Sequence, residues 1–143
     1  MIEVSEIRKR LRNTLEQGKR AASERRTRVD ASARAYETFL SEVATPVFRM
    51  FAGVVKAEGY AFTVFTPGGG LRFASERSAD DFIELFLDPD TDPPAVTARV
   101  NRGRGRRLMT YERPIREGAS VEQLTDEDVV TFLLAEVPAF IEK

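Results

Sequence analysis

The sequence predicts an α+β fold in which helices come first, an antiparallel sheet follows and a helix ends the chain. Apolar residues recur about every 3.6 positions over residues 4–43, which is the period of an amphipathic helix. From Tyr60 the period changes to two, as in strands with one covered face. After Thr125, three acidic residues precede another helical pattern, where they suit the positive end of a helix dipole.

Residues 1–44 are expected to form a long N-terminal helix. Large apolar side chains are absent between Gln17 and Arg28, so the pattern also fits two helices separated at Gly18, which can adopt the left-handed conformation of a helix C-terminus. We favour one long helix that is bent near Gly18. The apolar stripe of this helix begins with Val4, Ile7, Leu11 and Leu15.

The length of this helix predicts assembly. A helix of about 40 residues is about 60 Å long, whereas a domain of about 100 residues is only about 35 Å across. An unbroken helix would extend beyond such a domain, and another chain would have to cover its apolar stripe. We therefore expect residues 1–44 to act as a coiled-coil-like oligomerisation element and residues 45–143 to form the globular α+β domain.

A second helix is expected from Thr45-Pro46, a favourable N-cap followed by a favourable first helical residue, to Gly59. Apolar residues occupy more than one face of this helix, which predicts that it is largely buried. These residues are Val47, Phe48, Met50, Phe51, Val54 and Val55.

A C-terminal helix is expected after Thr125, which is spaced to form a capping box with Asp128. Pro138 should kink this helix or begin its last turn, because proline lacks the N–H that a continuous helix requires. The predicted apolar stripe consists of Val130, Leu133, Leu134, Val137 and Ile141.

Between these helices, the alternating pattern predicts a meander of four or five antiparallel strands. Residues 67–70 (PGGG) mark one hairpin turn, and residues 102–105 (RGRG) mark a second. The proline-rich residues 88–94 are expected to form a loop, because proline cannot donate to an internal ladder. The predicted strands are residues 60–66, 71–75, 82–87, 95–101 and 106–112.

The alternation places large apolar side chains on both faces of this sheet. Phe65, Phe82 and Phe86 fall on the face opposite the main apolar set, so both faces should be at least partly covered. We expect the helices of the protein to provide the cover, with a partner or ligand as the alternative. The main set is Phe62, Val64, Leu71, Phe73, Leu85, Val96, Ala98 and Val100.

Composition limits the chemistry that the chain can perform. It contains no Cys and no His, which excludes disulfides, the usual zinc and haem ligand sets, and Ser-His or Cys-His nucleophile pairs. We therefore predict a protein that is not an enzyme and that needs no cofactor or metal. The acidic, amphipathic N-terminus and the short apolar runs predict neither a signal peptide nor a membrane span, and hence a cytoplasmic protein.

Two short motifs are considered and set aside. Residues 59–65 (GYAFTVF) partly match the aromatic RNA-binding strand of an RRM, but Glu58 replaces the basic residue and the order of elements differs. Asp88, Asp90 and Asp92 imitate the start of an EF-hand calcium loop, but its later glycine and glutamate are missing. These segments are more simply a core strand and an acidic turn.

The leading functional hypothesis is a homo-oligomeric protein-interaction or assembly module, with Val4, Ile7, Leu11, Leu15, Phe65, Phe82 and Phe86 as its contact residues. The alternative is a nucleic-acid-binding protein that uses a basic helix at residues 8–28 and an arginine-rich hairpin tip. That tip contains Arg102, Arg104, Arg106 and Arg107. A third hypothesis is a small-molecule site between sheet and helices, for which no convergent polar set is visible.

Overall fold

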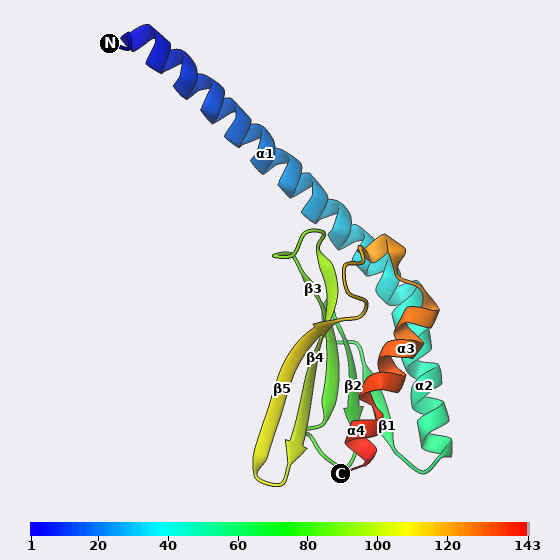
Figure 1. The fold of residues 1–143 in the computed structure, drawn as a ribbon. Coiled ribbons are helices and arrows are strands. Elements are labelled where there is room, and N and C mark those ends of the chain that lie inside the picture. The colour runs from blue at the N-terminus through cyan, green and yellow to red at the C-terminus, as the bar shows by residue number, and fades with distance from the viewer. Residues whose placement is uncertain (143) are drawn as a thin grey trace. The chain divides into compact units, whose positions relative to one another are not determined.

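The computed structural model describes residues 1–142 and confirms an α+β fold. Helices open and close the chain, and the strands lie between them (Figure 1). Residues 1–31 form one compact unit, and the residues from Ser32 onward form a second. The elements are α1 (Val4–Phe39), a π-helical stretch (Leu40–Ala44), α2 (Thr45–Ala57), β1 (Phe62–Phe65), β2 (Leu71–Ser75), β3 (Phe82–Asp88), β4 (Ala95–Arg104), β5 (Arg107–Pro114), a 3-10 turn (Val121–Gln123), α3 (Asp126–Glu136) and α4 (Pro138–Ile141).

Helix α1 is continuous through Gly18, so the long-helix prediction is confirmed and the two-helix alternative is wrong. A glycine inside a helix costs about 1 kcal/mol relative to alanine. Ending the helix at Gly18 would instead leave several backbone groups without their helical partners. A continuous helix with Gly18 in its interior is therefore favoured over a helix that ends there.

Helix α2 begins at Thr45, close to where the sequence predicts a helix, but Thr45 is not its N-cap, because the π-helical stretch runs directly into α2. Ala44 and Thr45 both have right-handed helical backbone angles, and no side chain caps the start of α2. The Thr45 N–H donates to the Leu40 carbonyl five residues earlier, which is the π-helical pattern. This wider turn lies immediately before Pro46, which has no N–H to donate. The proposed domain division at residue 44 stays a prediction.

Among the described residues, one helical stretch, Val4–Ala57, is long and apolar enough by length and composition to cross a membrane. The sequence-based prediction of no such stretch considers only uninterrupted apolar runs and not the mean hydropathy along a helix. A core helix passes the same test, and the C-terminal part of this stretch supplies Tyr36, Phe39, Val47 and Phe48 to the core.

The sheet is a meander in which each strand pairs antiparallel with the next, in the order β1-β2-β3-β4-β5. The second hairpin turns later than predicted, because β4 includes Arg102 and Arg104 and only Gly105 and Arg106 form the loop. Gly105 has a φ of +59°, and glycine at the first position of a two-residue loop is typical of a type II′ turn. Arg102 therefore belongs to a strand and not to the tip.

The core lies between one face of the sheet and helices α2 and α3 (Figure 1). Phe73 of β2 is fully buried at its centre: it stacks on Phe62 with ring centroids 4.7 Å apart and meets the edge of Phe48 at 6.0 Å. Tyr36, near the end of α1, joins this core. Burial and, to a lesser degree, the charge of Glu84 raise the pKa of the Tyr36 hydroxyl.

The predicted capping box at the start of α3 is confirmed. Thr125 accepts a hydrogen bond from the Asp128 N–H, and the Asp128 carboxylate accepts one from the Thr125 N–H at 2.9 Å. Burial alone would raise the pKa of Asp128, but the Thr125 hydrogen bonds and the cation of Arg116 at 3.0 Å outweigh it and lower the pKa. Pro138 begins the short helix α4, as predicted.

A buried carboxylate fixes α3 to the last strand. Glu136 is only 6% exposed, and it accepts hydrogen bonds from the Tyr111 hydroxyl and, at 2.7 Å, from Arg113. The Arg113 guanidinium also lies 5.0 Å from the centre of the Phe132 ring. Burial and the hydrogen bond to Glu136 raise the pKa of Tyr111 to about 12, so the phenol stays a donor at neutral pH.

This arrangement predicts that Glu136→Ala destabilises the fold. Removing the carboxylate leaves the partly buried Tyr111 and Arg113 donors without their acceptor, which should cost ~1–3 kcal/mol in the free energy of unfolding. Glu112→Ala is the matched control, because its ion pair with Arg99 is half exposed on both sides and should be worth less than ~1 kcal/mol. Urea denaturation measures both values, and equal losses would contradict the assignment.

Candidate interaction surfaces

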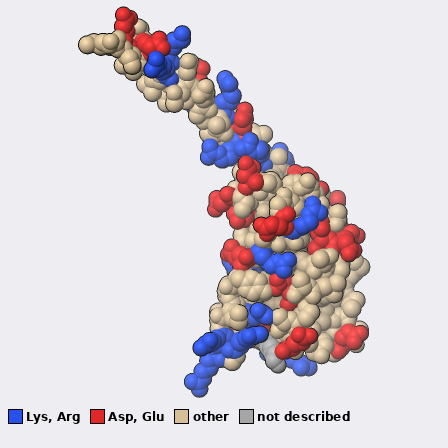
Figure 2. All heavy atoms as spheres, in the orientation of Figure 1, with Lys and Arg blue, Asp and Glu red and all other residues tan. Residues whose placement is uncertain are grey.

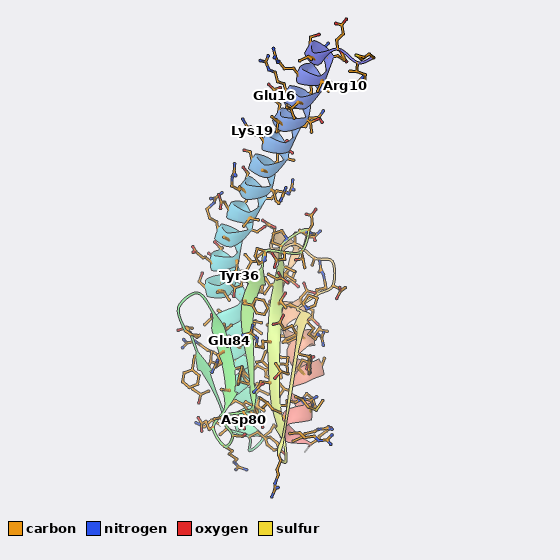
Figure 3. The ribbon with its side chains drawn as sticks, turned by 90° about the vertical axis from the view of Figure 1, so that its left-hand side faces the viewer. Arg10, Glu16, Lys19, Tyr36, Asp80 and Glu84 are labelled. Atoms are coloured by element: carbon orange, nitrogen blue, oxygen red, sulfur yellow. The ribbon has the colours of Figure 1, made fainter. Side chains whose placement is uncertain are left out.

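The N-terminal stripe consists of Val4, Ile7, Leu11 and Leu15, and all four side chains are exposed, by 53 to 71%. Their spacing of three, four and four residues places them along one side of α1. The rest of the segment is polar, and Figure 3 shows Arg10, Glu16 and Lys19 extending from it. Four exposed aliphatic side chains in line on a helix form an apolar surface.

The charge of the two units is opposite. Residues 1–31 contain nine Lys or Arg and five Asp or Glu, a net charge of +4. Residues 32–143 contain 13 basic and 18 acidic residues, a net charge of −5. The overall net charge of −1 therefore conceals a basic N-terminal helix and an acidic second unit.

A second apolar surface lies on the outer side of the helical layer. Helices α2, α3 and α4 border a groove of about 350 Å³, here called the α2–α3 groove. Val54 of α2 and Leu134 of α3 line it and are 64% and 60% exposed. Phe51, Tyr60 and Ile141 complete most of its apolar wall, and Glu58 stands at its edge.

Two sequence-based expectations about these helices are wrong. The sequence predicts a largely buried helix that includes Met50 and Val54, yet both are about two-thirds exposed. Leu134 belongs to the predicted apolar stripe of the last helix and is also exposed. The apolar residues of α2 do lie on more than one face of the helix. Only one of these faces is buried, so the inference of burial on all of them is wrong. Apolar residues on more than one face of a helix also fit a helix with one free apolar face, and this pattern in α2 is the sequence signal for the groove.

The sheet face opposite the core was expected to be covered by helices, and it is not (Figure 3). On this face the strand register aligns one row of five residues, one from each strand. Two of them, Arg72 and Glu84, form an ion pair at 2.7 Å. Arg99 and Glu112 form a second at 3.3 Å. The charges of this row therefore satisfy one another. The full row is Phe65, Arg72, Glu84, Arg99 and Glu112.

Arginine side chains cover two of the three phenylalanines predicted to be contact residues. The Arg72 guanidinium lies 4.2 Å from the centre of the Phe82 ring, and that of Arg99 lies 5.3 Å from the Phe86 ring. Both rings are half-buried in this way, and cation–π attraction adds to the cover. Phe65 alone stays more than half exposed, at the edge strand β1.

The four predicted arginines do not form one cluster. Arg104, Arg106 and Arg107 are exposed at the β4–β5 tip, where Figure 2 shows basic side chains gathered. Among residues 1–142 none of these three takes part in an ion pair. Arg102 instead lies over the Tyr111 ring at 5.9 Å, on the core side of the sheet. The exposed tip is thus smaller than predicted.

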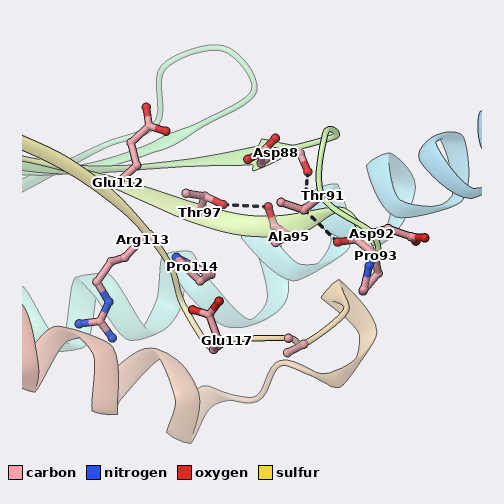
Figure 4. Close-up of a pocket in the computed structure, with 12 residues that line it drawn as sticks. Asp88, Thr91, Asp92, Pro93, Ala95, Thr97, Glu112, Arg113, Pro114 and Glu117 are labelled. Atoms are coloured by element: carbon pink, nitrogen blue, oxygen red, sulfur yellow. Dashed lines mark hydrogen bonds between the residues drawn. The ribbon is translucent and has the colours of Figure 1, made fainter.

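The acidic loop after β3 forms part of a pocket of about 390 Å³ (Figure 4). Within the loop, the Asp88 carboxylate accepts the Asp90 N–H at 3.0 Å, and the Thr91 hydroxyl donates to the backbone. These bonds are those of a self-satisfied turn. In the part of the chain described, no three Asp or Glu side chains are grouped as a metal site requires.

Comparisons with known protein families, curated proteins and solved structures found no match. The surfaces of the molecule are therefore the basis on which a function is assigned.

The α2–α3 groove predicts a contrast between neighbouring positions. Val54→Glu and Leu134→Glu should each change the free energy of unfolding by less than ~0.5 kcal/mol, because both side chains already face solvent. Val55→Glu, at a position only 7% exposed, should cost more than ~3 kcal/mol because it buries a charge. Urea denaturation at low protein concentration measures this, and equal costs at 54 and 55 would contradict a free groove.

Proposed function

We propose that this protein is a non-enzymatic interaction module that assembles into homo-oligomers through the apolar stripe of α1. The observation that carries the proposal is the exposure of four aliphatic side chains in line on one helix. Contiguous exposed apolar surface of this kind is uncommon in proteins that remain monomeric and marks an interaction site.

The physical driving force is burial of the stripe. Fully burying a valine, leucine or isoleucine side chain contributes ~1.5–3 kcal/mol relative to leaving it in water. Each stripe residue is already partly shielded by its own helix, so its gain is a fraction of that value. Four such gains in each copy support association, while the basic residues around them keep the free helix soluble.

The proposal predicts that Leu11→Glu together with Leu15→Glu abolishes assembly. Two carboxylates within the buried contact would have to be desolvated, which should weaken association by roughly 100-fold or more. Sedimentation velocity over a range of concentrations measures the loss, and circular dichroism checks that the helix remains.

Asn13→Glu with Gln17→Glu is the matched control. It adds the same charge on the other side of the helix, because residues two positions apart point in nearly opposite directions. This control should assemble like the wild type. A wild type that is monomeric at every concentration, or a stripe variant that assembles normally, would refute the proposal.

Nucleic-acid binding is a second candidate function, favoured by the three exposed arginines at the β4–β5 tip. Arginine side chains free of ion pairs attract phosphates, and their binding releases counterions. The arginines of the open sheet face, Arg72 and Arg99, offer no comparable attraction, because each is already paired with a glutamate. The candidate therefore rests on the tip together with the basic residues of α1.

If this second candidate holds, Arg104→Glu with Arg106→Glu should abolish binding to a mixed-sequence duplex at low salt. For the wild type, affinity should fall steeply as salt rises, and neutralising two contacts should lower the slope of that log–log plot by about 2. Arg49→Glu with Arg77→Glu is the control, with the same charge change on other exposed positions. Fluorescence anisotropy measures binding, and equal loss in both variants would indicate attraction by net charge only.

A further inference from the structure

We infer that the α1 stripe of one copy binds in the α2–α3 groove of a second copy. The inference rests on the proposed function and names the surface that receives the stripe. Among the exposed apolar surfaces of the described residues, one lies on α1 and one on the outer side of α2 and α3. An amphipathic helix lying in an apolar groove between helices is a common mode of recognition.

The shapes of the two surfaces fit this mode. The stripe presents side chains at positions i, i+3, i+7 and i+11, which is the spacing of anchors on one face of a helix. The groove runs between two helices and is walled almost entirely by apolar side chains, with Val54 and Leu134 as its most exposed large apolar residues. The stripe supplies protruding apolar side chains, and the groove supplies an apolar surface that can receive them.

Charge complementarity favours the groove as the binding partner of the stripe. The helices that border the groove and the helical turns before them, residues 40–58 and 121–142, contain eight Asp or Glu and two Lys or Arg. Two of these carboxylates, Asp128 and Glu136, are held by arginines of the same chain. Six acidic residues against two basic ones remain on these elements, and one of the six, Glu58, lines the groove itself. The docking helix segment has a net charge of +4 and so complements this acidic unit.

Pairing of the stripe with the same stripe of another copy is less favourable. Two segments of net charge +4 repel each other. The stripe also loses its large apolar residues after Leu15, so it is shorter than the three to four heptads typical of a stable coiled coil. The groove of a second copy is therefore the better partner for the stripe.

A mixing experiment with two full-length variants tests this inference. The stripe variant, Leu11→Glu with Leu15→Glu, keeps an intact groove, and the groove variant, Val54→Glu with Leu134→Glu, keeps an intact stripe. Each alone should be monomeric at concentrations where the wild type assembles, with self-association weakened by roughly 100-fold or more. An equimolar mixture should recover a 1:1 complex, because one stripe and one groove remain. Native mass spectrometry identifies both chains in it.

The outcomes separate the inference from the proposed function. A groove variant that assembles like the wild type, beside a monomeric stripe variant, would overturn the inference and leave the proposed function standing. A mixture that stays monomeric would also overturn it. A wild type that never assembles would refute both. Val54→Ser with Leu134→Ser replaces the groove variant if the charged one does not fold.

Salt gives an independent readout of the same contact. Docking of a basic helix on an acidic surface should weaken as salt rises, because screening reduces the attraction. Pairing of two basic helices should instead become stronger, because screening reduces the repulsion. Sedimentation of the wild type at low and high sodium chloride measures the sign, and stronger assembly at high salt would contradict the inference.

Discussion

The structure depends on one constraint: the five-stranded sheet has helices on only one of its faces. Phe73 and its aromatic neighbours form the contact between sheet and helices, and α2 and α3 are held in place by it. A single helical layer on a single sheet leaves two further surfaces without cover: the open face of the sheet and the outer side of the helices. The side chains on each of these two surfaces determine what the molecule can bind there.

The open sheet face is satisfied within the chain. Arg72 and Arg99 each do two things there, since each pairs with a glutamate on a neighbouring strand and lies over a phenylalanine ring. The long arginine stems cover apolar area while the guanidinium groups form the ion pairs. The charges of this face are thus paired within the chain, while an exposed aromatic ring, Phe65, remains at its edge.

Much of the fold follows from the sequence alone. The class, the long helix, the meander and the capping box at Thr125 each depend on local pattern, which a sequence records directly. The predictions that are wrong concern which face of an element other elements cover. The sequence shows that α2 is apolar on several faces, but only the structure shows that Val54 lies on the side that no other element covers.

The candidate surfaces divide in the same way. The α1 stripe is visible in sequence because its residues are close together along the chain. The α2–α3 groove combines residues about 80 positions apart, Val54 and Leu134, and so depends on tertiary packing. The bond between Glu136 and Tyr111 is hidden for the same reason: no local pattern links a helix glutamate to a particular tyrosine of a strand.

The contrast between the two uncovered surfaces supports placing the partner on the helical side. On the sheet, charges are matched within the chain, and a partner would have to break those pairs before forming its own. On the outer side of the helices, apolar side chains face water beside Glu58, in a unit whose net charge is −5, so a basic and apolar partner would gain on both counts. The protein carries a segment of that description in its own first 31 residues. A chain that holds both halves of a complementary pair is suited to assemble with copies of itself.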